Sequence, residues 1–212
     1  MRILVDAHLV SLSGADRNAW AMTIAALSNR ASVSDPNEIF VLTDGRDLDG
    51  ADLGTARIVD FAHRDTPFQT VATEADLITE MCRTLDIDVF VTAGNSYQWA
   101  CPSVAVLLGS TGHASGASQA VAWVLAHQFV TRSERDRDEL RRECGFIRDE
   151  DVHVARVRQS DVYASATNLA EKIDEACRRA ASPDSAARAV LSQPEITALV
   201  RDYQSRIQRI QI

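Results

Sequence analysis

Residues 129–157 read FVTRSERDRDELRRECGFIRDEDVHVARV, and this segment contains a complete strand–helix–strand pattern. The apolar run at 128–131 predicts a strand, Ser133 is a typical N-cap for the charged helix after it, and Gly145 marks the end of that helix. A second apolar run at 152–157 predicts another strand. Because the helix carries the chain back along the sheet, we expect the second strand to lie parallel to the first.

The same alternation extends over the first 157 residues. Further apolar runs predict strands at 3–5, 39–42, 56–61, 88–91 and 103–108, and apolar residues at helical spacing predict helices at 20–27, 71–85 and 121–125. The run at 103–108 is rich in aliphatic residues, which is typical of a strand buried on both faces. We therefore predict an α/β fold in which residues 1–157 form one doubly wound, mainly parallel, Rossmann-like sheet domain.

Residues 158–212 are predicted to form a helical extension of this domain. Apolar patterns predict helices at 169–180 and 195–210, separated by Ser182-Pro183 and Gln193-Pro194. Two helices are too few to enclose a second core, so we expect both to pack back onto the sheet.

Composition excludes several classes of protein. The 212 residues are 46% hydrophobic and 25% charged, as in ordinary globular proteins. A formal net charge of −8 argues against nucleic-acid binding, because phosphate contacts need a basic surface. The sequence has no run of eighteen apolar residues and no pattern typical of a signal peptide, so we expect no membrane span and a cytoplasmic protein.

The sequence also argues against a metal or cofactor. Cys82, Cys101, Cys144 and Cys177 show no CxxC or other tight ligand spacing, so we interpret them as free thiols and predict no metal site. The loop at 13–15 before the first helix could hold an anion, but it is neither GxGxxG nor a Walker motif, and it could equally be a simple turn. We predict no bound cofactor.

Candidate site residues come from the loops that follow the strands, because ligands bind at the carboxyl ends of parallel strands. The candidate binding residues at these positions are Ser13, Gly14, Asn95, Ser96 and Tyr97. His8 and His63 also follow strands, but strand-end loops are polar in any protein. His113 lies in the Gly/Ser-rich stretch at 109–118 and is the candidate catalytic residue.

Four segments together resemble a known family. MRILVDAHLV (1–10) with its small-residue loop, DIDVFVTAGNSY (86–97), CPSVAVLL (101–108) and residues 129–157 are similar, in order and spacing, to the acceptor-side half of retaining glycosyltransferases. These are GT-B-fold enzymes of the family that includes sucrose-synthase-like enzymes and mannosyltransferases. The resemblance covers residues 1–157 and implies the N-terminal half of that fold.

The sequence departs from the family pattern at two places. Family enzymes usually carry a His-Asp pair after the strand that matches 103–108, where this chain has Leu108 and Gly109. Neither residue can bind a sugar hydroxyl through its side chain. The half that binds the nucleotide sugar has no counterpart in the residues after Val157, although TNLAEKIDEACRRAASPD (167–184) resembles the family's closing helices. The resemblance therefore implies a truncated, degenerate form.

Three functions follow from this interpretation. The first is an accessory, partner-binding subunit that is glycosyltransferase-like but inactive alone, a pseudoenzyme that binds a sugar acceptor, a protein partner or a second copy. The second is an active half completed by another polypeptide, and the third is a small-molecule-binding regulatory module. For partner binding we expect an exposed aromatic pair, Tyr97 and Trp99. Alternatively, both rings fold onto the edge of the sheet.

Overall fold

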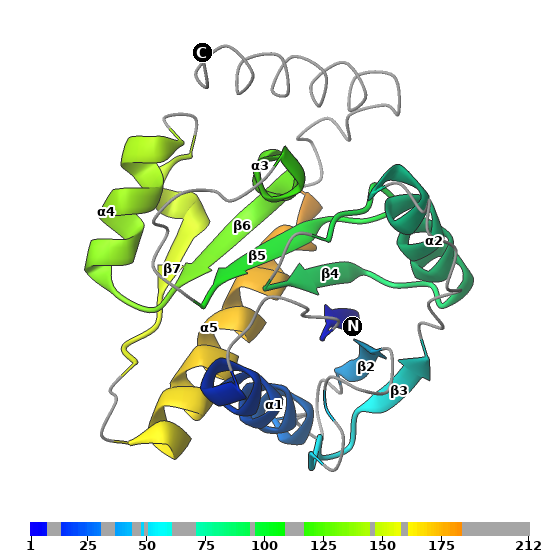
Figure 1. Cartoon of the computed structure of the whole chain (residues 1–212), viewed down its shortest axis with the longest axis horizontal. Coiled ribbons are helices and arrows are strands. Elements are labelled where there is room, and N and C mark those ends of the chain that lie inside the picture. The colour runs from blue at the N-terminus through cyan, green and yellow to red at the C-terminus, as the bar shows by residue number, and fades with distance from the viewer. Residues whose placement is uncertain are drawn as a thin grey trace.

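The computed structural model describes residues 1–7, 14–30, 37–43, 48, 51–60, 71–93, 96–108, 117–144, 147–157 and 161–183. Its strands are β1 (Arg2–Asp6), β2 (Glu38–Thr43), β3 (Arg57–Asp60), β4 (Val89–Thr92), β5 (Ser103–Leu107), β6 (Ala126–Thr131) and β7 (Val152–Val154). Within the described residues these seven strands form one all-parallel sheet in the order β3-β2-β1-β4-β5-β6-β7 (Figure 1). The predicted α/β class with a parallel, Rossmann-like sheet is confirmed.

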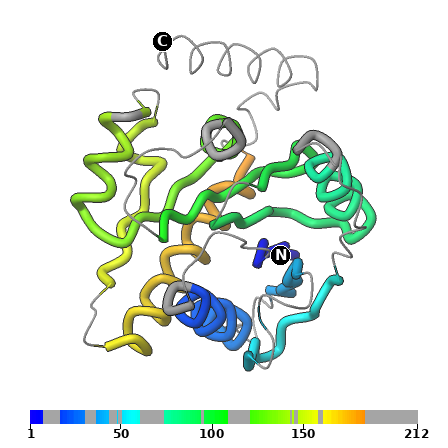
Figure 2. Tube along the Cα trace, in the orientation of Figure 1, coloured from blue at the N-terminus to red at the C-terminus, as the bar shows by residue number. Residues whose placement is uncertain are grey.

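Helices cover both faces of the sheet (Figures 1 and 2). Helices α1 (Gly14–Asn29) and α5 (Val162–Ala180) lie together on one face, while α2 (Val71–Thr84), α3 (Ala117–Leu125) and α4 (Glu134–Glu143) lie on the other. A short 3₁₀ turn, η1 (Asp149–Asp151), leads into β7. Because the strand order reverses at β1, the ends of β1 and β4 form the position where doubly wound sheets open a crevice.

Alternating side chains explain why the strands have two apolar faces. In β1, Ile3 and Val5 belong to the apolar cluster that includes α1 and α5, whereas Leu4 belongs to the cluster under α2. All three side chains are fully buried. Burying a side chain of this size stabilises the fold by about 1.5–3 kcal/mol, so the central strands contribute on both faces.

Helix α5 is part of the main core. Leu169, Ile173 and Cys177 are buried in the same cluster as α1 and the central strands, which confirms that the predicted helix at 169–180 packs back onto the sheet. The helix begins seven residues earlier than predicted, because Asp161 caps it by accepting a hydrogen bond from the Ala164 N–H at 2.9 Å. The predicted helix at 195–210 lies outside the described residues.

Strand β7 ends at Val154, three residues before the predicted end at Val157. The Arg156 N–H donates to Asn168 Oδ1 of α5 at 2.7 Å. The Ala155 N–H still donates to the Thr131 carbonyl of β6 at 2.7 Å, so the chain after β7 is bonded both to the sheet and to α5. The predicted cap of α4 is confirmed, since Ser133 Oγ accepts from the Asp136 N–H at 3.1 Å.

A buried polar chain fastens α5 to β6 and β7. Gln128 donates through Nε2 to Asp151 Oδ1 at 3.3 Å and accepts at Oε1 from His153 Nε2 at 2.9 Å. His153 Nδ1 faces Glu175 Oε1 of α5 at 3.5 Å, and the Arg148 guanidinium closes the other end on Asp151. Burial lowers the pKa of His153, and the Glu175 carboxylate opposes only part of that shift.

Candidate functional site

Polar side chains end several strands at the carboxyl edge of the sheet. Asp6, Thr43, Thr92 and Thr131 are the last residues of β1, β2, β4 and β6, and each is at most 3% exposed. Ligands of open parallel sheets bind outside this edge. The end of β4 lies beside the reversal of strand order. The segments around it are therefore the expected position of a ligand site.

The connection from β4 to β5 explains the surroundings of Tyr97. The chain leaves β4 after Thr92 at the carboxyl edge and enters β5 at Ser103 at the opposite edge, and its described parts, 93 and 96–102, contain no helix. The connection therefore lies along the face of the sheet, where Tyr97 packs against Ala75 of α2 and Val121 of α3. The expectation of an exposed aromatic pair is wrong for Tyr97, which is 7% exposed.

Trp99 differs from Tyr97. It is half-buried, it packs at the margin of the same cluster, and its backbone N–H donates to Thr79 Oγ1 of α2 at 3.3 Å. Both rings thus lie against the sheet domain, as in the alternative interpretation, because the connection takes the position that a crossover helix usually occupies.

Gln98, which the sequence analysis did not select, holds this connection in place. It is 1% exposed, and its Oε1 accepts from the N–H groups of Ala100 and Cys101 at 2.5 and 3.1 Å. Its Nε2 donates to the Cys101 carbonyl at 2.7 Å and to Ser103 Oγ at 2.9 Å. One amide therefore satisfies three backbone polar groups of the connection and the Ser103 hydroxyl.

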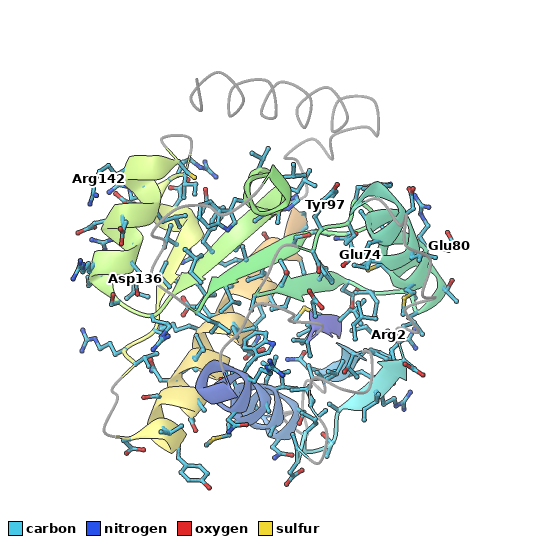
Figure 3. All side chains as sticks on the ribbon, viewed as in Figure 1. Arg2, Glu74, Glu80, Tyr97, Asp136 and Arg142 are labelled. Carbon is cyan, nitrogen blue, oxygen red and sulfur yellow. The ribbon has the colours of Figure 1, made fainter. Side chains whose placement is uncertain are left out.

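The first turn of α2 meets the start of this connection, and Glu74 is placed between them. The Ser96 hydroxyl donates to Glu74 Oε1 at 3.4 Å. Burial raises the pKa of Tyr97, and the charges of Glu74 and Asp76 raise it further, so the phenol keeps its proton at neutral pH. Figure 3 labels Glu74 on α2 and Tyr97 on the connection. Ser96 and Tyr97 are buried and Glu74 is half-buried, so Glu74 is the member of this group that a ligand can reach.

The described part of the site is suited to hydrogen bonding with hydroxyl groups. A carboxylate accepts hydrogen bonds, and hydroxyl groups both donate and accept them. The Arg132 guanidinium, which enters the same edge after β6, donates to the Leu108 carbonyl. Leu108 itself is buried, with 5% of its surface exposed.

Of the remaining predicted site residues, the structure describes only Gly14. Gly14 is the first residue of α1, so its backbone begins that helix at the carboxyl edge. Ser13, Asn95, His113, His8 and His63 lie outside the described residues, as does Gly109. Their binding and catalytic roles stay predictions.

Two other kinds of feature are absent from the part of the chain that the structure describes. Within these residues, no group of three or more His, Cys, Asp or Glu side chains is arranged to hold a metal ion. None of the helices that the structure describes combines the length and apolar character needed to cross a membrane.

Comparisons with solved structures identify the fold. The UDP-GlcNAc 2-epimerase from Neisseria meningitidis, solved with UDP-GlcNAc bound, aligns with a TM-score of 0.50 and 14% identity over 73% of this chain and 46% of its own. A lipopolysaccharide outer core galactosyltransferase in its apo form aligns with a TM-score of 0.51 and 14% identity over 73% and 45%. The fold is a GT-B-like half-domain.

This assignment confirms the fold that the resemblance implied. A second structure of UDP-N-acetylglucosamine 2-epimerase, with a TM-score of 0.51 and 10% identity over 73% of this chain and 48% of its own, has the same half-domain. This chain spans less than half the length of each of these proteins. At such identities the likeness shows the fold alone. No protein-family model matches the sequence, and no curated protein matches it significantly.

Proposed function

We propose that this GT-B-like half-domain is an accessory subunit of sugar transfer, which binds a hydroxyl-rich acceptor and does not transfer sugar by itself. The observation that carries the proposal is the position of Glu74. Its carboxylate lies at the carboxyl end of β4, beside the reversal of strand order, and accepts a hydrogen bond from Ser96. Ser96 positions this carboxylate through that hydrogen bond, and the remaining capacity of the carboxylate accepts from sugar hydroxyls.

Lack of transfer activity is proposed from Leu108. It occupies the position of the family's histidine, and its backbone carbonyl is already engaged by Arg132. An aliphatic side chain stabilises no charge that develops during transfer, so the rate of the chemical step falls even where an acceptor binds. We expect nucleotide sugars to bind to this chain no more tightly than in the millimolar range.

Isothermal titration calorimetry with neutral mono- and disaccharides tests acceptor binding. We expect the wild-type chain to bind at least one of them and Glu74→Gln to weaken that binding about tenfold, because a hydrogen bond to a charged acceptor is worth more than one to an amide. Glu80→Gln is the matched control, since Glu80 lies on the same helix and pairs with Arg83 at 3.5 Å. Equal affinities for both variants, or no binding of any saccharide, would reject the proposal.

An active half completed by another polypeptide is the second candidate function. It is supported by the lengths of the similar structures, of which this chain spans 45–48%. In this case sugar transfer appears only when the other polypeptide is present. An assay with radiolabelled nucleotide sugars, run with the chain alone and with any protein that co-purifies from its host, separates the two functions.

Partner binding is proposed at Trp99, the half-exposed member of the aromatic pair. A protein partner or a second copy would cover this ring in the cytoplasm. Trp99→Ala should then abolish association in analytical ultracentrifugation and change the melting temperature of the monomer little. Association that survives the replacement places the interface elsewhere.

A further inference from the structure

The candidate site also holds a cation, Arg132. This residue directly follows β6, and its Nη1 donates to the carbonyl of Leu108, which directly follows β5. The guanidinium therefore lies at the carboxyl end of β5, the strand that pairs with β4 in the sheet. Glu74 and Ser96 are hydrogen-bonded at the end of β4, so the two charged side chains belong to adjacent strand ends.

The chain around Arg132 is held on both sides. The Thr131 hydroxyl donates to the Ser133 carbonyl at 3.2 Å, and Ser133 caps α4. The Arg132 carbonyl accepts from the Val157 N–H at 3.4 Å. Arg132 is half-buried, and the Leu108 carbonyl holds its guanidinium. Binding of a ligand therefore orders little that is not already ordered, which favours affinity.

The bond to Leu108 positions the guanidinium without neutralising it, because a carbonyl oxygen carries no net charge. A guanidinium presents its N–H groups in a planar fork that matches the oxygens of a phosphate or a carboxylate. In a half-buried position the attraction between opposite charges is stronger than in open water. Arg132 is therefore suited to bind an anionic group.

Glu74 and Arg132 favour different groups of one ligand. The Glu74 carboxylate accepts hydrogen bonds from hydroxyl groups and repels an anion, whereas the Arg132 guanidinium attracts an anion. A ligand with hydroxyl groups at one end and an anionic group at the other satisfies both side chains. Such a ligand also binds in a single orientation, because the reverse orientation brings two negative charges together.

We propose that the acceptor is a sugar with an anionic group, either a phosphate or a carboxylate, which Arg132 binds while Glu74 accepts from the hydroxyl groups. This inference rests on the proposed function, because it names the class of acceptor for the same site. A neutral sugar occupies the site with lower affinity, since it makes no ion pair with Arg132. Arg132 thus determines which acceptor binds.

Isothermal titration calorimetry of the full-length chain tests the proposal with three sugars that differ at one carbon. Glucose carries a hydroxyl group there, glucose 6-phosphate a phosphate ester and glucuronic acid a carboxylate. We expect at least one anionic sugar to bind at least about tenfold more tightly than glucose, and the tighter of the two identifies the anionic group. This preference should shrink as salt is raised from about 0.01 to about 0.15 M, because the Debye length falls from about 30 to about 8 Å.

Single variants identify the residue responsible. Arg132→Gln removes the charge while its amide can still donate to the Leu108 carbonyl, so the preference for the anionic sugar should nearly vanish. Arg135→Gln is the matched control, since Arg135 is exposed on α4, and it should keep the wild-type preference. Glu74→Gln should weaken the binding of glucose while the preference for the anionic sugar persists.

The outcomes separate this inference from the proposed function. Equal affinity of the wild type for all three sugars, or an unchanged preference in Arg132→Gln, would overturn the inference and leave the proposed function standing. No binding of any of the three would reject the proposed function and this inference with it. The wild-type affinities and their salt dependence decide the question even if Arg132→Gln does not fold.

Discussion

The two faces of the sheet are packed differently. On the α1–α5 face, α1, α5 and inward side chains from the central strands share one continuous apolar cluster. On the α2–α4 face, the described residues form three smaller clusters, separated where the β4–β5 connection and its polar residues cross the sheet. The first face stabilises the fold, whereas the second exchanges some apolar packing for hydrogen bonds that position Glu74 and its neighbours.

The largest effect should follow from a cavity in the α1–α5 face. Ile173 is fully buried between α5 and the sheet, so Ile173→Ala should lower the free energy of unfolding by about 3 kcal/mol, through lost burial and the cavity left behind. Leu77→Ala on α2, where the leucine is 44% exposed, is the control and should cost less than about 1 kcal/mol. Urea denaturation measures both, and similar losses would contradict the burial of Ile173 in the core of the α1–α5 face.

Removing the Gln98 side-chain amide, which holds the β4–β5 connection, should have the next largest effect. Gln98→Ala leaves the Ala100 and Cys101 N–H groups without their acceptor, so we expect a loss of about 2 kcal/mol. Hydrogen exchange should show faster exchange of these amides while those of β1 stay protected. If the exchange at Ala100 and Cys101 is unchanged, Gln98 is not what holds the connection.

Loss of the α4 cap should be smaller. Ser133→Ala removes the acceptor for the Asp136 N–H, which should cost about 1 kcal/mol in thermal or urea denaturation. Arg135→Ala in the first turn of the same helix serves as the control. A change below about 0.3 kcal/mol in Ser133→Ala would show that the helix end finds other partners.

The smallest effect should be a change in the pH dependence of stability. It comes from His153, which belongs to the buried polar chain that joins β6 and β7 to α5. The pKa of His153 in the folded chain lies below its value near 6.5 in the unfolded chain, so protonation favours unfolding. Stability should be constant above about pH 6.5 and fall as the pH drops from there through the folded pKa. His153→Gln should flatten this slope in urea denaturation at a series of pH values. A wild-type curve that rises toward low pH would refute it.

Much of the fold could be predicted from the sequence because each strand is a short apolar run and each crossover helix has its own periodicity. The exposure of Tyr97 could not, since the sequence around it does not reveal that the chain crosses a buried face there. Glu74 and Gln98 were missed for a related reason, because their roles depend on segments that meet only in the fold. The hydrogen bond between Asn37 and Asp174, 137 residues apart, is another contact of this kind.

Amide chemical-shift mapping by two-dimensional NMR tests most directly that the carboxyl end of β4 is the functional edge. During titration with a neutral disaccharide, we predict shifts concentrated at Thr92, Ser96 and the first turn of α2, and in Glu74→Gln these shifts should need about tenfold more disaccharide. The amino edge, where Arg2 and Arg57 pair with Glu38, should stay unchanged. Shifts at that opposite edge, or the same dependence on disaccharide concentration in wild type and Glu74→Gln, would contradict the account.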